Sequence, residues 1–452
     1  MVGSCLHGTH EGRALNIRYA KTLVERIVEE EKEMIRLSRI LGTILPLALL
    51  VAATEATGQD TLKVTADNPA SWGDHPQLVE EARIGTLEGP EETSFGQVAG
   101  VGVMPDGTIW IGDNHLGAIR RFDTDGTYLG QVGRKGEGPG EFGYPSEIRV
   151  LPDGRVAVRD TGLKRVSLFE QTGEFLHSFR FPVQGYSALR VDMEGNLYLF
   201  GATSVFTREE AEKLANAIRS SEREGQSGAL RLLADNTQAE GETRRLFWLR
   251  MSPEGEITDT LFRPELPEDD FWGVWSRVGF NPKGYFAIAV GKTDRYEITY
   301  RRPDSTVVLI ERPIEPIRWE PEERREQERL EQIFSSRGGA SGEVTEFKPP
   351  FNDLWIDQES RFWVTVRAPG IREETPGEAH RRERYDGPVQ EWREPFVTEV
   401  FEADGTYLGT VRFPNRQTEL EAARGTTVWV VEKGPWDEDY VVRYRIESGG
   451  QG

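Results

Sequence analysis

The sequence contains few of the residues that catalytic and redox sites most often use. It has one cysteine, Cys5, and six histidines in 452 residues. A chain whose single cysteine lies at its extreme N-terminus has no intramolecular disulfide and no cysteine cluster for a metal. It also has no Gly-x-Ser-x-Gly motif, so a hydrolase of the nucleophile-elbow type has no support. These absences favour a non-catalytic protein, with an enzyme as the alternative.

Positive charge is also scarce. The chain has 55 lysines and arginines against 76 aspartates and glutamates, which gives a formal net charge of −21. A surface this acidic repels phosphate groups. We therefore expect no nucleic acid partner.

Long apolar runs are limited to one segment near the N-terminus. Arg36 and Arg39 precede an apolar run over 40–53, and Ala56-Thr57-Gly58 supplies small residues for cleavage. This three-part pattern predicts a signal peptide over 34–58, and the run is shorter than a membrane span. We expect export to the periplasm or the medium, with no membrane span after cleavage. No cysteine follows the cleavage point, so we expect no lipid anchor.

The segments beside the signal peptide are interpreted from its position. Because a signal peptide opens a chain, we interpret Met34 as the start and residues 1–33 as a mis-assigned upstream extension. Residues 59–77 are predicted to be a linker, and residues 447–452 a tail.

The rest of the chain is rich in glycine, proline and short alternating segments. Residues 101–133 and 148–179 both consist of four apolar strands, with a Pro-Asp-Gly turn after the first. Asp106 and Asp153 of these turns lie 47 residues apart. Strands with a period of two residues, repeated at this spacing, are typical of a β-propeller with four strands per blade.

Weaker copies extend the pattern to six blades over 78–446. The last copy, residues 418–448, has only three strands, while 78–89 offers an unassigned strand at the other end of the repeat region. We therefore predict an all-β, six-bladed β-propeller in which this N-terminal strand completes the last blade and leaves no open sheet edge.

The junction between the first two blades reads "GPGEFGYPSEIRVLPDGRVAVRDTGLKRVSLF". Its Gly-Pro-Gly-x-Phe, Pro-Asp-Gly and Arg-Val-x-x-Phe landmarks closely resemble an NHL repeat, most strongly over residues 85–182. The resemblance implies an exported bacterial propeller of the NHL-like type, a fold that serves many functions. The glycine-rich stretch over 133–145 has neither the helix nor the Gly-Lys-Ser/Thr of a nucleotide site, so we interpret it as a blade junction.

Three long insertions interrupt the blades, over about 201–243, 313–350 and 368–394. In the predicted topology all three emerge on one face, where they would form a cap with helical segments over one end of the central channel. Residues 320–336 are predicted to form a charged helix anchored by Leu330, Ile333 and Phe334. Loops on a rigid scaffold often carry function, so we expect a protein or small-molecule ligand at this capped face.

Aligning the six inner strands on their turns predicts which side chains reach the channel. One position is apolar in all six: Val101, Ile148, Leu189, Val278, Leu354 and Leu420. The flanking positions point the opposite way. They supply eight candidate ligand-binding residues: Glu147, Arg149, Arg190, Arg277, Asp353, Trp355, Glu419 and Glu421.

Two functions follow from these residues. Charged groups in a channel must be paired, hydrated or bound to a ligand, and arginines with carboxylates suit a polar binding pocket. The alternative resembles the six-bladed gluconolactonase group, a metal-dependent type of hydrolase or lyase. In that case Glu147, Asp353 and Glu419 would bind a divalent cation such as Ca²⁺. We favour the binding module.

Overall fold

The computed structural model describes residues 61–181, 188–204, 244–262, 276–302, 306–336, 344–384 and 391–449. The predicted extension, the signal peptide and most of the first insertion (201–243) lie outside these residues. The chain divides into two compact units. The larger comprises Gln59–Phe181, Ser187–Phe200 and Trp248–Gly452, and it carries the site described below. Of the smaller, the structure describes only 201–204 and 244–247, which are parts of strands β12 and β13.

Six sheets of four or five strands form the blades of the propeller, which confirms the predicted fold. In the first three blades the strands follow each other in sequence order. The first blade contains β3 (Val98–Val103), β4 (Ile109–Asp113), β5 (Ala118–Phe122) and β6 (Tyr128–Val132), and the second contains β7 (Pro145–Val150), β8 (Val156–Asp160), β9 (Arg165–Phe169) and β10 (Phe175–Arg180). The third contains β11 (Leu189–Val191), β12 (Leu197–Ser204), β13 (Arg244–Met251) and β14 (Ile257–Phe262).

The other three blades receive strands from elsewhere or contain insertions. The fourth blade contains β15 (Ser276–Asn281), β16 (Tyr285–Lys292), β17 (Arg295–Arg301) and β18 (Val307–Pro313). The fifth contains β19 (Phe351–Ile356), β20 (Phe362–Val366), β23 (Val397–Phe401) and β24 (Tyr407–Arg412). The sixth contains β25 (Thr418–Arg424), β26 (Thr427–Lys433) and β27 (Asp439–Glu447). The first strands of successive blades are in contact: β25 contacts β3, and β3 contacts β7. These first strands therefore surround the central axis of the propeller.

The Pro-Asp-Gly turns form as their sequence predicts. Gly107 and Gly154 adopt φ of 89° and 88°, a conformation that glycine reaches without steric cost. The side chain of Asp106 accepts a hydrogen bond from the Thr108 N–H (2.9 Å), and Asp153 accepts one from the Arg155 N–H (3.0 Å). Each turn therefore fixes the register of the inner strand against the second strand.

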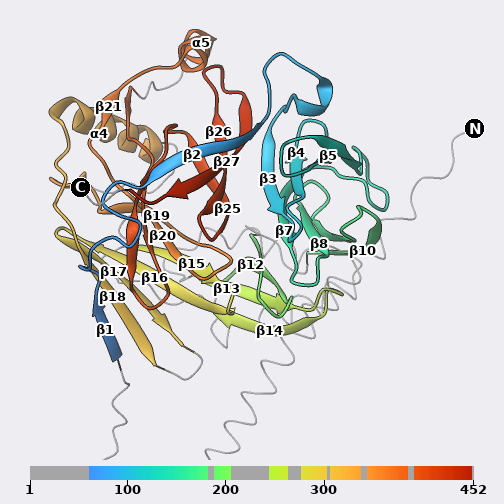
Figure 1. Cartoon of the computed structure of the whole chain (residues 1–452), viewed down its shortest axis with the longest axis horizontal. Helices are drawn as coiled ribbons and strands as arrows, with labels where there is room; N and C mark the ends of the chain where they lie inside the picture. The colour runs from blue at the N-terminus through green and yellow to red at the C-terminus, as the bar shows by residue number, and fades with distance from the viewer. Residues whose placement is uncertain are drawn as a thin grey trace, which may run out of the picture. The chain divides into compact units, whose positions relative to one another are not determined.

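The ring closes through an N-terminal strand, as predicted. Strand β2 (Gln77–Ile84) pairs antiparallel with β27 and completes the sixth blade. Figure 1 shows β2 in blue beside the red strand β27. Strands from the two ends of the repeat region are thus held in one sheet, and β2 covers the edge that β27 would otherwise expose.

The predicted linker over 59–77 needs a correction. Residues Thr61–Thr65 form strand β1, which pairs in parallel with β18 as a fifth strand of the fourth blade. Val64 of β1 packs close to Gly405 of the fifth blade, since a Cβ added to this glycine would lie only 2.8 Å from Cγ1 of Val64. The alternating sequence TLKVT suits an edge strand, but no repeat partner reveals it in the sequence.

The core lies between neighbouring blades. Of the six aligned apolar positions, Val101, Ile148, Leu189 and Leu354 are buried, and the other two are half-buried. Phe142 of the glycine-rich stretch is fully buried with Trp110 and Phe169 between the first two blades. That stretch is therefore a packed blade junction.

Two helices and a small hairpin belong to the second and third insertions. Helix α4 (Pro321–Ser336) precedes β19, while β21 (Ile371–Arg372), α5 (Pro376–Arg384) and β22 (Trp392–Arg393) lie between β20 and β23. A short 3-10 helix (Glu91–Thr93) precedes β3. None of the helices in the described part of the chain is long and apolar enough to span a membrane.

Candidate ligand-binding channel

A cavity of about 1560 Å³ is lined by the inner strands of all six blades. Seven of the eight predicted residues line it: Glu147, Arg149, Arg190, Asp353, Trp355, Glu419 and Glu421. Arg277 lies half-buried on β15 and is not among the lining residues. The alignment on the turns therefore brings predicted residues from four blades to one cavity, although these blades are far apart in the sequence.

Glu147 is the centre of an arginine cluster on the second and third blades. Its carboxylate lies 2.8 Å from Arg159, 3.1 Å from Arg190 and 3.3 Å from Arg149. It also accepts a hydrogen bond of 2.6 Å from the Leu189 N–H on the next blade. Burial acts to raise the pKa of Glu147, but the three guanidinium groups outweigh it, so this pKa lies below its usual value.

Two arginines of this cluster also bind a backbone carbonyl that they share. Arg149 and Arg190 both donate to the Leu189 carbonyl, at 3.1 and 2.8 Å. The side chain of Arg190 stays 36% exposed. Burial, and then the charge of Arg149, lower the pKa of Arg190. The cluster thus carries more positive than negative charge beside the cavity.

Strand β25 of the sixth blade carries the opposite charge. Glu419 is exposed and Glu421 is half-buried, and Glu421 accepts a hydrogen bond of 3.2 Å from the Val101 N–H of the first blade. Burial, followed by the charge of Glu419, raises the pKa of Glu421 to about 7. Burial also raises the pKa of Glu419. Arg149 acts against both shifts, without forming an ion pair with either carboxylate.

The fifth blade adds one acid and one aromatic residue. Asp353 accepts a hydrogen bond from the Leu354 N–H (2.9 Å). Trp355 packs edge-on against Trp363, with ring centroids 5.9 Å apart. Trp355 therefore offers a fixed apolar surface to the cavity beside a polar side chain.

The predicted metal ligands are not brought together. Among the described residues, no group of three or more His, Cys, Asp or Glu side chains is arranged to hold a metal ion. Glu147 is instead occupied by three arginines, while Asp353 and Glu419 line other parts of the cavity wall. A Ca²⁺ site at Glu147, Asp353 and Glu419 thus has no support in this geometry.

Helix α4 of the cap is held by buried charges. Lys348, whose side chain is fully buried, lies 2.6 Å from Glu323 of α4 and 3.0 Å from Glu394, and it donates to the Ala368 carbonyl (2.9 Å). Glu326 of α4 accepts hydrogen bonds from the backbone N–H groups of 391 and 392, at 2.8 and 3.1 Å. These contacts tie the second insertion to the third.

This arrangement corrects the predicted anchor of the helix. Leu330 and Ile333 are only half-buried, and the side chain of Phe334 lies outside the described residues. The fully buried positions of α4 are instead Glu323 and Glu326. Apolar periodicity could not reveal them, because the partners that bury them are distant in sequence: Lys348 lies 25 residues from Glu323, and the two N–H groups lie 65 and 66 residues from Glu326.

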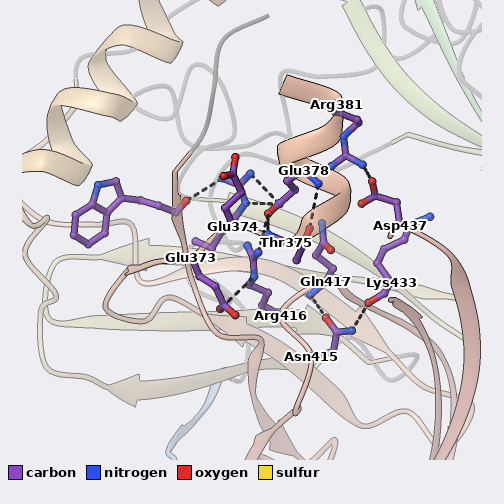
Figure 2. A network of polar contacts seen from close by, with 12 residues as sticks. Glu373, Glu374, Thr375, Glu378, Arg381, Asn415, Arg416, Gln417, Lys433 and Asp437 are labelled. Atoms are coloured by element: carbon purple, nitrogen blue, oxygen red, sulfur yellow. Dashed lines mark hydrogen bonds and ion pairs between the residues drawn. The ribbon is translucent and has the colours of Figure 1, made fainter. Parts of the chain in front are cut away.

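Helix α5 of the cap is fixed to the sixth blade by the polar network in Figure 2. Thr375 and Glu378 form a capping box: the Glu378 N–H donates to the Thr375 hydroxyl (3.2 Å), and the Thr375 N–H donates to the Glu378 carboxylate (2.9 Å). Glu378 also lies 3.0 Å from Arg416 and 3.2 Å from Arg393. Burial opposes the effect, but these partners hold the pKa of Glu378 below its usual value.

The network ends at the loops that lead into the inner strand of the sixth blade. Arg381 forms an ion pair with Asp437, and Asn415 is bonded to both Gln417 (2.8 Å) and the Lys433 carbonyl (2.5 Å). Because residue 416 lines the cavity and stands two positions before the start of β25, the network also positions the acidic strand. Four residues with these roles were not predicted from the sequence: Arg159, Lys348, Glu378 and Arg416. Of these, only Glu378 has a local signal, the Thr-x-x-Glu spacing of the capping box.

Comparisons with known proteins agree on the fold. A family model described as "6-bladed beta-propeller" matches residues 78–237. No curated protein matches the chain.

Similar solved structures are distant in sequence. A Bacteroides fragilis protein described as exported has 12% identity and a TM-score of 0.42, over 86% of this chain and 99% of that one. A PQQ-bound aldose sugar dehydrogenase from Streptomyces coelicolor has 14% identity and a TM-score of 0.37, and the match covers 84% of this chain and 100% of that one. A Xanthomonas campestris gluconolactonase has 13% identity and a TM-score of 0.35, and the match covers 82% of this chain and 95% of that one. Similarities this low carry no argument about activity.

Proposed function

We propose that this protein is an exported, NHL-type propeller that binds a small ligand in its central channel, beneath the cap made by its insertions. One observation carries the proposal. The channel has room for a ligand, about 1560 Å³. On its wall Arg149 and Arg190 share the one carboxylate of Glu147, while Glu419 and Glu421 have no ion-pair partner within 4 Å among the described residues. Pockets of this size, with a few oriented polar groups, are typical of small-molecule sites.

The lining chemistry favours recognition. Arg149 and Arg190 are oriented by backbone carbonyls and by Glu147, so their remaining N–H groups are available for an anionic ligand group at little entropic cost. The cap adds aromatic residues to the same cavity: Trp319 and Trp392, near Trp355 and Phe396 of the fifth blade. The proposed export rests on the signal-peptide pattern over 34–58, and the NHL type on the repeat landmarks.

The test uses protein recovered from cells that produce the full chain. Mass spectrometry of its N-terminus would find Gln59 if export and cleavage occur as proposed. A thermal-shift screen of charged small molecules, followed by calorimetry, should then give at least one ligand.

Channel variants locate that ligand. Its affinity should fall at least tenfold in Arg190→Met or in Glu421→Gln, and stay unchanged in Glu92→Gln, which changes an exposed carboxylate outside the cavity. Either of two results would overturn the proposal: no compound binds, or the bound compound is indifferent to both channel variants.

A further inference from the structure

The charges of the channel are sorted by blade. Arg149 and Arg190 stand on β7 and β11, in the second and third blades, and Glu419 and Glu421 stand on β25, in the sixth. In a ring of six, the third and sixth blades are opposite one another. Arg190 pairs with Tyr198 of β12, while Glu421 stands at the register shift between Leu420 and Ala422 of β25. Both residues line the cavity, from blades that lie opposite one another.

Neither cluster is neutral. Three guanidinium groups share the single carboxylate of Glu147. On the other side, neither Glu419 nor Glu421 has an ion-pair partner within 4 Å in the part of the chain that the structure describes. The raised pKa of Glu421 and the lowered pKa of Arg190 are what such uncompensated clusters produce. An anionic group at the first cluster and a cationic group at the second would each be stabilised.

The inner strands of the first and fourth blades, which lie between the two clusters, bring no charged side chain to the cavity. The first blade contributes Gly100 and Gly102, and the fourth contributes Gly279. A Cβ at Gly102 would lie 2.6 Å from Ile148, so packing of the blades demands the small residue there. Trp355 adds an apolar surface. An extended chain with unlike charges at its two ends fits this pattern.

We propose that the channel ligand is a short zwitterionic peptide, with its carboxylate held by Arg190 and Arg149 and its terminal ammonium held by Glu421 and Glu419. The proposal rests on the proposed function, because it specifies the ligand of the same cavity. Arginine binds a carboxylate through paired N–H donors, and the acidic pair offers several acceptor oxygens to an ammonium group.

The experiment compares three peptides by calorimetry at pH 7.0 on the full chain: triglycine, N-acetyl-triglycine, which lacks the cation, and triglycine amide, which lacks the anion. Triglycine should bind at least tenfold more tightly than either analogue. Glu421→Gln should reduce the affinity for triglycine to that for the acetylated peptide, whose affinity should not change. Arg190→Met should reduce the affinity for triglycine to the affinity that the unaltered protein has for triglycine amide. The comparison on the unaltered protein stands even if a variant does not fold.

The results separate this proposal from the one on which it rests. If the three peptides bind equally well, or if none binds while a compound from the screen binds in the channel, the zwitterion proposal is wrong and the binding function stands. If neither the peptides nor any screened compound binds, the binding function itself is wrong.

Discussion

Two carboxylates of one channel, Glu147 and Glu421, stand in opposite electrostatic environments. Both belong to inner strands and both line the cavity. Glu147 has three arginine partners and a backbone donor, and its pKa lies below the usual value. Glu421 has a backbone donor and a neighbouring carboxylate, and its pKa is raised to about 7. Burial pushes both pKa values upward, so the neighbours decide the outcome.

The difference follows from what each carboxylate contacts. Glu147 joins the second blade to the third, because it accepts from Arg190 and from the Leu189 N–H. At Glu421, burial and the charge of Glu419 favour the protonated form, while Arg149 and the Val101 N–H act in the opposite direction.

Removing the first carboxylate should have the largest effect. Glu147→Gln leaves three partly buried guanidinium groups without their shared anion, and we expect unfolding in urea at pH 7 to require about 3 kcal/mol less free energy. This is the low end of the range for breaking a buried ion pair, since the arginines keep contact with the cavity. Because the pKa of Glu147 is lowered on folding, its contribution exists at neutral pH and disappears as the pH falls through that lowered pKa.

The control for this variant is Glu92→Gln, which neutralises an exposed surface carboxylate. It should change the free energy of unfolding by no more than about 0.5 kcal/mol. Equal losses in the two variants would mean that the arginine cluster does not depend on Glu147.

Neutralising the second carboxylate should have the opposite sign. The raised pKa of Glu421 means that the folded state holds a proton more tightly than the unfolded state does. Ionisation therefore costs stability increasingly from about pH 4.5 to pH 7, and the cost is constant above that. Glu421→Gln should raise the free energy of unfolding by about 2 kcal/mol at pH 8, after allowance for screening of this partly exposed group.

At pH 4 the same variant should have almost no effect, because Glu421 is then protonated in the folded protein and largely so in the unfolded chain. Denaturant unfolding at the two pH values checks this difference. A variant less stable than the wild type at pH 8 would show that Glu421 has a compensating cation, and the comparison with Glu147 would fail.

The sequence was sufficient for the blades and for most of the channel wall. Repeated Pro-Asp-Gly turns set the strand register, so an alignment alone places Glu147, Arg149, Arg190 and Glu421 on the cavity. Arg277 was aligned in the same way but does not line it. The repeat is sufficient to assign Arg277 to the inner strand β15. Whether its side chain extends into the cavity depends on the packing of neighbouring residues, which the repeat does not specify.

The partners of these residues could not be predicted. Arg159 lies on the second strand of its blade, outside the aligned positions, yet it makes the shortest ion pair with Glu147. Glu323 looks like one more charge on a charged helix until Lys348 packs against it. Strand β1 has no counterpart in the repeat. Each of these contacts depends on segments that meet only in the folded chain.

The smallest effect that we predict isolates the interaction within the acidic pair. Burial is the main cause of the raised pKa of Glu421, and the charge of Glu419 comes next. Glu419→Gln should therefore lower the pKa of Glu421 and leave it above the usual value for glutamate. Arg149→Met should raise that pKa, because Arg149 acts in the opposite direction. Carboxyl ¹³C NMR titration of Glu421 measures both changes. If Glu419→Gln leaves the titration midpoint in place, the two carboxylates do not act as a pair, and a ligand cation would be held by Glu421 alone.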